Sequence, residues 1–536
     1  MVSLQYYVFY YVLNWCKFRA SQAGGPVFGP PSRTLEGGSY RLRASRRRQS
    51  ASLSDIKPER LHFGPPTTAA NRNVVFFLLF LTVASISCFA LAYYVFTTRW
   101  DIQPGSVRIQ STNASWQATA SLSASDIKYL AYLPHSGFHN QRIAFENALV
   151  LAYTLNRTLI VPPIHLGNRP MHYAQYDLLL QVHESASKRS LAHCAKLPTY
   201  LWQPSECLDY SSTTTLPWEW LFNLTAIRLR QPLLICAEMT QSWFSRYLPL
   251  PEDETIILRE DSPYHFRFLD SITDSAPSSE RYGEDIYIPA LNQVTRRLLR
   301  TGSLFGTARV RLRNRGNKDH RDLIRKALIP NHPSILRASE AICNRLGDNY
   351  LAAHVRAGDG SFTHKAEGTV ALVWKRLVLE VLAIPAEPAC KLLESIDPSS
   401  TIPCEPQSTG GETLKIKQGR KPSFSCRGVL HPSGPLETLN TPLYLATDIP
   451  DPHKDPLLRI LRLTFPCMFI LADFTQALAP LEDLVSPYDA VRLYSFLLPF
   501  VDGLVAGRAA HVVGTEGSTY SQYVERRLWN HFHAAD

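Results

Sequence analysis

Strand-like and helix-like segments alternate along the chain, and this alternation restricts the fold more than any other feature of the sequence. The first series predicts a strand over residues 128–133, a polar loop over 134–140, a helix over 141–155 and a strand over 158–162. Strands separated by a helix at this spacing belong to a parallel sheet, because the helix carries the chain back to the same edge. The sequence therefore predicts an α/β fold.

A second series of the same kind begins near residue 350. Its expected elements are a strand from 350, a strand at 443–447, a helix at 455–464, a strand at 467–471, a helical region at 488–507, a strand at 510–513 and a helix from 518. A chain of 536 residues is also too long for one core of usual size. We therefore expect two Rossmann-like domains facing a cleft, over residues 126–345 and 346–536, with an irregular insertion at 385–441.

The N-terminal part of the chain predicts a membrane anchor. Residues 74–96 form a 23-residue run without a charged side chain, long enough to cross a hydrocarbon core as a transmembrane helix. Residues 1–73 hold eleven Lys/Arg and three Asp/Glu, and this basic, disordered tail should stay cytoplasmic. Residues 97–125 are rich in Ser, Thr and Ala and resemble a stem. We expect a single-pass type II protein of the Golgi or endoplasmic reticulum membrane, with its bulk lumenal.

Charge and cysteine content agree with that location and exclude other classes. The net charge is +10, but residues 1–73 carry +8 of it, so the folded part offers no basic face for nucleic acid. Eight of the ten cysteines follow the uncharged run, and an even set in an oxidising lumen predicts disulfides whose pairing stays open. Glycosylation sequons at Asn113, Asn156 and Asn223 also follow the run.

Three loops at strand ends could carry chemistry, and the most informative is His354-Val-Arg-Ala-Gly-Asp-Gly360. It follows an apolar strand, and open α/β sheets bind ligands at the carboxyl ends of their strands. The guanidinium of Arg356 could hold a diphosphate by two-point contact. The alternative is a salt bridge between Arg356 and Asp359 in an ordinary loop.

The other two loops enter helix N-termini, where free backbone N–H groups and the helix dipole favour an anion. The first is Pro134–Arg142, in which Asn140 supplies an amide, and the second is Gly514–Ser521, in which Ser518 can cap the helix. Plain turn and capping motifs are the alternatives. The chain has no Walker A, G-x-G-x-x-G or Asp-x-Asp pattern, so we expect no metal, and phosphate charge must be met by Arg356 and backbone amides.

Four motifs in order carry a resemblance to a known family. Ser136-Gly-Phe-His-Asn-Gln141, with Leu155–Pro163 after it, resembles the opening of the GDP-fucose protein O-fucosyltransferases, and His354–Asp359 is similar to their H-x-R-x-G-D motif. Leu445–Asp448 and Gly514–Ser521 resemble the two later motifs, whereas residues 166–340 match nothing we can name. The resemblance implies a GT-B-like fold and an inverting, metal-independent transfer of fucose from GDP-fucose to a protein or glycan acceptor.

The resemblance also implies roles for ten residues of this chain. Arg356 and Asp359 would be catalytic, with Arg356 on the β-phosphate and the leaving oxygen. The residues that would bind GDP-fucose are Gly137, Phe138, Asn140, His354, Asp448, Ser518, Thr519 and Tyr520. No cofactor is implied beyond this donor substrate.

The chain departs from the family at the catalytic base. Some members have Arg where Gly137 stands, and others have a Glu in that loop that acts as the catalytic base. Neither residue is present here. Inversion requires the acceptor hydroxyl to lose a proton, so Asp359, Glu146 and His139 are the candidate bases, with Asp359 favoured. Otherwise a dissociated fucosyl cation forms and phosphate takes the proton. The rival functions are transfer of another nucleotide sugar, or an inactive membrane-tethered module that binds glycan or protein.

Overall fold

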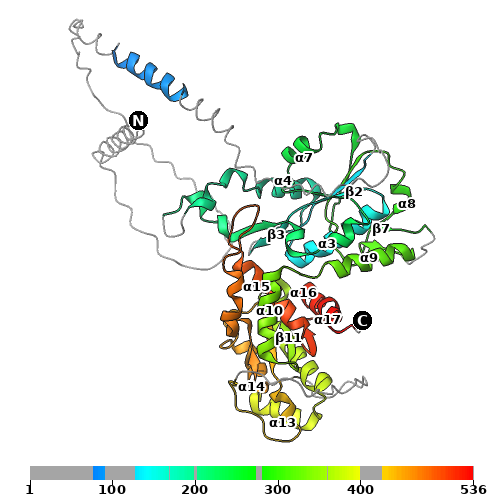
Figure 1. Ribbon diagram of the computed structural model, residues 1–536, viewed down its shortest axis with the longest axis vertical. Coiled ribbons are helices and arrows are strands. Elements are labelled where there is room, and N and C mark those ends of the chain that lie inside the picture. The colour runs from blue at the N-terminus through cyan, green and yellow to red at the C-terminus, as the bar shows by residue number, and fades with distance from the viewer. Residues whose placement is uncertain are drawn as a thin grey trace, which may run out of the picture. The chain divides into compact units, whose positions relative to one another are not determined.

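The computed structural model describes most of the C-terminal four-fifths of the chain and one N-terminal helix (Figure 1). The described residues are 76–90, 127–167, 170–197, 202–272, 281–358, 360–398, 402 and 425–534. The chain divides into two compact units, 1–103 and 104–536. Everything described below, apart from one helix, belongs to the second unit.

The described part of the first unit is an α-helix over residues 76–90 with nearly all side chains exposed. It lies inside the predicted membrane span 74–96, whose two ends fall outside the described residues, as do the tail 1–73 and the stem 97–125. Among the described residues, no helix is both long enough and apolar enough to cross a membrane. The membrane anchor therefore stays a prediction.

The first strand–helix series forms a parallel five-stranded sheet in the order β5-β2-β1-β9-β6, as the sequence predicts. The strands are β1 (Tyr129–Tyr132), β2 (Thr158–Val161), β5 (Leu233–Ile235), β6 (Thr255–Leu258) and β9 (Leu298–Thr301). The helix α3 (Phe138–Thr154) connects β1 to β2. Its middle is buried all round, which explains why it is apolar over most of its length.

The second series forms a parallel four-stranded sheet in the order β13-β12-β11-β14. The strands are β11 (Leu351–Val355), β12 (Leu443–Thr447), β13 (Met468–Phe469) and β14 (His511–Gly514). In this register His354 on β11 pairs with Ala446 on one side and with Gly514 on the other. The three strands therefore end at the same edge, next to the loops that the sequence singles out.

Helices and two smaller sheets complete the unit. Antiparallel β3 (Ile164–Gly167) and β4 (Thr213–Leu216) form one sheet, and parallel β10 (Val310–Arg311), β7 (Phe266–Leu269) and β8 (Glu284–Tyr287) form the other. The remaining α-helices are α4 (Tyr176–Ser185), α5 (Trp218–Leu221), α6 (Thr225–Arg228), α7 (Gln241–Tyr247), α8 (Ile288–Leu291), α9 (Arg315–Ala327), α10 (Pro333–Leu346), α11 (Gly360–Thr363), α12 (Ala366–Lys375), α13 (Ala386–Ile396), α14 (Arg459–Thr464), α15 (Tyr494–Gly507), α16 (Thr519–Tyr523) and α17 (Trp529–His533).

One apolar core connects the two main sheets. It contains Leu130 and Phe145 from the first series together with Tyr444 and Leu504 from the second. Helix α10 packs against α15 and against η9 (Leu471–Leu481), although it precedes the domain boundary predicted near residue 345. The two halves of the unit are thus joined by packing as well as by the chain.

The predicted insertion 385–441 begins with regular structure, which differs from the expectation of an irregular segment. Helix α13 buries Ala389, Leu393 and Ile396, and this spacing places all three on one face. The helix was missed because two turns of a pattern between prolines are too short to stand out. Residues 399–401 and 403–424 lie outside the described part of the chain.

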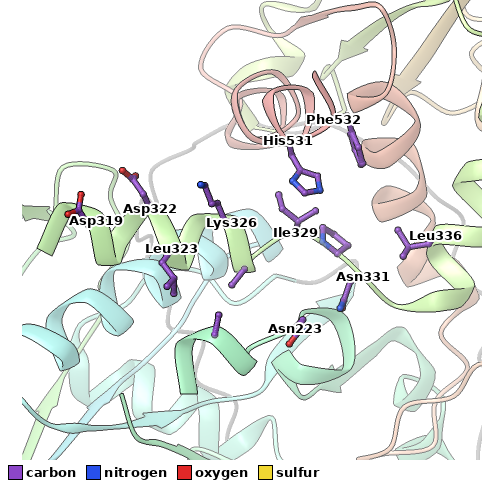
Figure 2. A pocket seen from close by; sticks show the side chains of 13 residues that line it. Asn223, Asp319, Asp322, Leu323, Lys326, Ile329, Asn331, Leu336, His531 and Phe532 are labelled. Atoms are coloured by element: carbon purple, nitrogen blue, oxygen red, sulfur yellow. The ribbon is translucent and has the colours of Figure 1, made fainter. Parts of the chain in front are cut away.

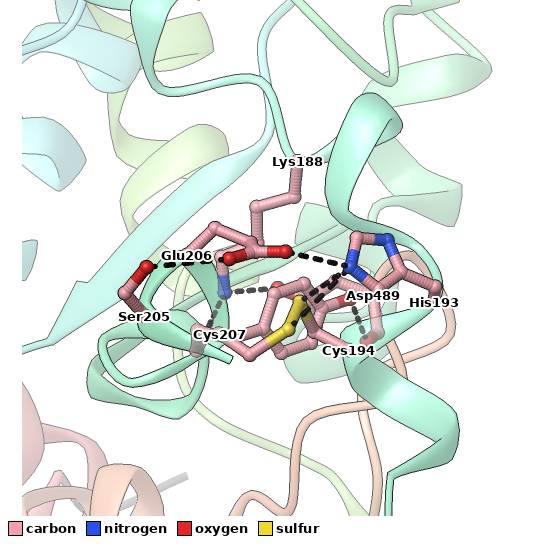
Figure 3. Close-up of a disulfide and its surroundings, with 8 residues drawn as sticks. Lys188, His193, Cys194, Ser205, Glu206, Cys207 and Asp489 are labelled. Carbon is pink, nitrogen blue, oxygen red and sulfur yellow. Dashed lines mark hydrogen bonds and ion pairs between the residues drawn. A yellow bond between two sulfur atoms is a disulfide. The ribbon is translucent and has the colours of Figure 1, made fainter. Parts of the chain in front are cut away.

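Two disulfides confirm the expectation of cysteine pairing. Cys194 pairs with Cys207 and Cys426 pairs with Cys467 (the first is drawn in Figure 3). Cys236, Cys343 and Cys390 are free thiols, and Cys404 lies outside the described residues. The Cys426–Cys467 disulfide closes a loop that contains β12 and α14, so it restricts the unfolded chain around one strand of the second sheet.

A buried ion pair beside the first sheet generates a stability prediction. The Arg309 guanidinium lies 3.1 Å from the Glu260 carboxylate with both side chains fully buried, and it also donates to the carbonyl oxygens of Ser303 and Pro263. We expect Glu260→Gln to lower the free energy of unfolding by about 3–5 kcal/mol, because it leaves a buried charge unpaired.

Urea denaturation measures this change. The matched control is Glu387→Gln, which breaks an exposed pair with Lys391 at 2.7 Å and should leave stability unchanged within error. Equal midpoints for the two variants would contradict the assigned role of the Arg309–Glu260 pair.

Candidate functional site

A cavity of about 470 Å³ lies where the carboxyl ends of the second sheet meet the N-terminus of α3. It brings together eight of the ten residues predicted from sequence: Gly137, Phe138, Asn140, His354, Arg356, Asp448, Thr519 and Tyr520. Asp359 lies outside the described residues, and Ser518 does not line the cavity. Residues far apart in the chain therefore form one site.

Hydrogen bonds between β11 and β14 fix the Arg356 backbone. The Thr515 hydroxyl accepts from the Arg356 N–H and donates to the His354 carbonyl oxygen, both at 2.9 Å. The Arg356 guanidinium lies 5.1 Å from the ring centre of Phe362, a cation–π distance. The strand end thus places one cation at the cavity wall.

His354 is held in a neutral, oriented state beside Arg356. Its Nδ1 lies 2.6 Å from the Ser521 hydroxyl, which also accepts from the Thr515 N–H. Burial and the charge of Arg356 lower the pKa of His354 to about 3, so the ring carries no charge at neutral pH. His354 can therefore orient a ligand by a hydrogen bond but adds no positive charge.

Asp448 shapes the loop that follows β11. Its Oδ1 accepts from the N–H groups of Ala357 and Gly358 at 2.8 and 3.1 Å. A Cβ at Gly358 would lie 3.1 Å from the Asp448 carboxyl, so glycine lets the loop approach this closely. Asp448 lines the cavity, as predicted, but at least one of its oxygens serves the protein itself.

Asn140 bridges the two halves of the unit across the cavity. It lies in the first turn of α3, and its Oδ1 accepts from the Thr519 hydroxyl of α16 at 3.1 Å. Gly137, the N-cap of α3, provides no side-chain cap. Two helix N-termini, those of α3 and α16, consequently contribute residues to the lining of the same cavity.

Ser518 has a structural place in α16. Its side chain is buried, and as N-cap it accepts from the Ser521 N–H at 3.3 Å. Thr519 and Tyr520 follow it into the cavity lining, and the Tyr520 hydroxyl donates to the Pro499 carbonyl oxygen. The capping role that the sequence predicts for Ser518 is thus confirmed, whereas the direct contact with ligand that the family resemblance implies stays a prediction.

The three candidate bases have different surroundings. Glu146 is buried 2.6 Å from Arg325 and 3.7 Å from Arg142, away from the cavity lining, so its carboxylate belongs to a structural ion cluster. Asp359 cannot be placed, because it lies outside the described residues. His139 lines the cavity. Of the two candidates that the structure describes, His139 is therefore the one at the site.

Asp502 is a cavity residue that the sequence reasoning missed. It projects from the apolar helix α15, and the Tyr444 hydroxyl donates to its Oδ1. Burial raises the pKa of Asp502 to about 7, although the bond from Tyr444 lowers it. A lone carboxylate in the apolar stretch 493–507 was the available signal. Phe305 and Phe362 also line the cavity and were missed.

A larger cavity of about 750 Å³ lies elsewhere, between α9, the start of α6 with the turn before it, and the C-terminal helix (Figure 2). Leu323, Ile329, Leu336 and Phe532 give it a mainly apolar lining, with Asp319, Asp322 and Lys326 along α9. None of the ten predicted site residues lines it, although the sequon residue Asn223 does. Size alone therefore does not mark the functional site.

The part of the chain that the structure describes contains one His/Cys/Asp/Glu group of the size that holds a metal: His193, Cys194 and Cys207. The His193 Nε2 lies 3.6 Å from each sulfur (Figure 3). The two sulfurs are bonded to each other, so neither is a thiolate ligand in this state. The group lies outside the lining of the cavity at the strand ends.

Comparison with known proteins agrees with the motifs. The family model for GDP-fucose protein O-fucosyltransferase matches residues 129–369, which include the segment 166–340 that the motifs alone left unassigned. The curated protein O-fucosyltransferase 30 of Arabidopsis thaliana is 65% identical over 37 residues. That match spans only 7% of this chain and 7% of the relative.

Solved structures of POFUT1 are also similar. The complex with GDP is 14% identical, with 76% of this chain and 96% of that chain covered and a TM-score of 0.32. The complex with GDP-fucose is 16% identical, with 76% and 96% covered and a TM-score of 0.30.

The family match contains β1, the α3 loop and the Arg356 loop, and it ends before the Asp448 and Ser518 motifs. Its two motif-bearing loops are those that form the cavity wall with Asn140 and Arg356. Over residues 129–369, the chain is similar to the GDP-fucose protein O-fucosyltransferase family.

Proposed function

We propose that this protein transfers fucose from GDP-fucose to a hydroxyl group of an acceptor, with the 470 Å³ cavity as the donor site. The observation that carries the proposal is the meeting of Arg356, Asn140 and the α16 N-terminus around one cavity within a chain similar to this family. Each of these groups favours an anion. A nucleoside diphosphate fits that combination.

Arg356 would bind the β-phosphate and the leaving oxygen, where negative charge grows as the sugar departs. The backbone contacts from Thr515 support this role, because they hold the strand end at which the guanidinium starts. The N–H groups and side chains at the starts of α3 and α16 would share the remaining phosphate oxygens. No metal ion is required by this arrangement, and we expect a metal-independent reaction.

Asp502 would select the guanine base. Guanine presents two neighbouring N–H donors, on N1 and on the exocyclic N2, and one ionised carboxylate can accept both. Asp502 lines the cavity and is bonded to the fully buried Tyr444, so the base would enter with its polar edge toward α15. His354, neutral and oriented by Ser521, would contact the nucleotide nearby.

The transfer would invert the configuration at the fucose C1, because the two described carboxylates that line the cavity, Asp448 and Asp502, have other roles in this proposal, in the loop after β11 and at the guanine base. The membrane anchor at 74–96 and a lumenal location in the Golgi or endoplasmic reticulum belong to this proposal as well. The two disulfides support an oxidising compartment.

The missing Arg and Glu near Gly137 favour the inactive binding module as a second candidate. Measuring GDP release from GDP-fucose and from GDP-mannose distinguishes the fucosyltransferase, a transferase for another sugar and the inactive module. Turnover of GDP-fucose alone supports the proposal, whereas binding without turnover supports the module.

Removing the Arg356 guanidinium tests the leaving-group role. We expect Arg356→Ala to lower the turnover number ~10²–10³-fold in GDP-release kinetics, because the developing phosphate charge loses its cation. Arg356→Lys should keep only part of the wild-type turnover number, since an ammonium cannot make the two-point contact. The exposed Arg526→Ala, on the same half, is the control for lost charge and should keep full activity. Full activity in Arg356→Ala refutes the role.

Replacing Asp502 tests base selection. We expect Asp502→Asn to weaken GDP binding about 10–100-fold in calorimetry, because its amide N–H₂ would face the guanine N–H groups. The wild type should prefer GDP to inosine diphosphate, which lacks the 2-amino group, and the variant should bind the two about equally. A preserved preference in the variant would show that another group reads the base.

Protonation of Asp502 predicts a pH dependence of GDP binding. Its pKa, raised to about 7, leaves the carboxyl ionised above that pH and protonated below it. Since only the carboxylate can accept both N–H groups, affinity should fall ~10-fold from pH 8 to pH 6. In Asp502→Asn only the phosphate ionisation changes with pH, so its GDP affinity should depend less on pH than that of the wild type. Parallel profiles for the two proteins would exclude Asp502 as the titrating group.

A further inference from the structure

A second cavity of about 600 Å³ adjoins the donor cavity. The two share Gly137, Phe138, His139, Pro499 and Tyr520 in their linings. The second cavity extends from these residues toward β3, β4 and the start of α15, with Ser and Thr side chains of residues 211–215 on its wall. A molecule in the second cavity would therefore reach the donor sugar past the first turn of α3.

The described lining of this second cavity has little free charge. Lys188 is its one lysine or arginine, and the Lys188 Nζ lies 2.9 Å from Asp489 and donates to the Tyr210 carbonyl oxygen. Hydroxyl groups and aromatic rings, among them Phe496 and Phe500, make up much of the rest. This chemistry fits an uncharged, hydroxyl-bearing ligand.

His139 stands at the junction with an unsatisfied ring. Its Nδ1 is buried without a hydrogen-bond partner among the described residues. The ring packs against Tyr520 and Tyr523 of α16, at centroid distances of 5.0 and 4.9 Å, and these contacts hold its plane. Since Nδ1 is enclosed, Nε2 is the ring nitrogen that a ligand can reach.

We propose that the second cavity receives the acceptor and that His139 is the catalytic residue that takes the proton from its hydroxyl group. The inference rests on the proposed function, since it assumes GDP-fucose in the first cavity. It supplies the base that the sequence lacks near Gly137, and it places that base on the shared wall of both cavities.

The step balances as follows in atoms and charge. The acceptor oxygen forms a bond to the fucose C1 as the bond from C1 to the β-phosphate oxygen breaks. The electron pair of that bond leaves on GDP, next to Arg356. The acceptor proton moves to His139 Nε2, because Nδ1 is closed off, and afterwards passes to solvent.

The charges around His139 keep it in the proton-accepting form. Burial is the main cause that holds the pKa of His139 well below its usual value, and the positive charges of Arg142 and Arg356 lower it further. Tyr520 and Tyr523, which also face the ring, stay neutral because burial raises their pKa. The two negative charges of a bound diphosphate offset Arg356, so donor binding raises the basicity of His139 at the moment it is needed.

The test compares His139→Gln with the wild type in two assays. With GDP-fucose as donor and water or added glycerol as acceptor, we expect the variant to lower the turnover number ~10²-fold. Its affinity for GDP, measured by calorimetry, should stay within about threefold of wild type, since the phosphate site is intact. His531→Gln, an exposed histidine on α17, is the matched control and should change neither quantity.

Two outcomes overturn the inference. Unchanged turnover in His139→Gln removes the catalytic role, and a loss of GDP affinity equal to that of Arg356→Ala makes His139 a donor-binding residue instead. Failure of the proposed function is distinct, because it appears in the wild type as absent turnover of GDP-fucose, with or without binding. A dissociative reaction with phosphate as proton acceptor predicts the first of the two outcomes.

Discussion

The parallel pairing of β11 with β12 and β14 is the constraint on which the site depends. His354 pairs with Ala446 and with Gly514, so three loops separated by up to 160 positions in the chain emerge side by side. A one-residue slip of β11 would turn His354 away from Ser521 and move Arg356 off Thr515. The chemistry of the loops therefore follows from strand register.

Contacts between the two halves of the unit determine whether that edge becomes a closed site. The Asn140–Thr519 bond ties α3 to α16 at the cavity. A second tie between the halves is made by Asp489, which forms an ion pair with Lys188 and accepts a hydrogen bond from the Thr214 hydroxyl. The Cys194–Cys207 disulfide packs beside Tyr210 and Val491, next to this second tie (Figure 3). The disulfide thus stabilises a segment that forms part of the second cavity's wall.

The sequence predicted the parts of the site that depend on local pattern. Apolar strands followed by Arg356, Asn140 or Thr519 are visible in the chain, and the structure brings all three to one cavity. The cavity position of Asp502 and the burial of Ser518 were not predictable in this way, because a helical pattern does not show which side chain faces another element. Glu146 was misjudged for the same reason, since its arginine partners Arg321 and Arg325 lie on another helix, about 180 residues away.

The charge arrangement of the cavity favours an ordered reaction. His354 and His139 are both kept neutral by burial and by the charge of Arg356. The guanidinium of Arg356 is therefore a cation beside two uncharged imidazoles. Arrival of a diphosphate offsets that cation and raises the pKa of the neighbouring rings. A base whose pKa rises only when the donor is bound would take the proton from the acceptor hydroxyl after donor binding. Donor binding before acceptor activation is then a consequence of electrostatics, without any movement of the chain.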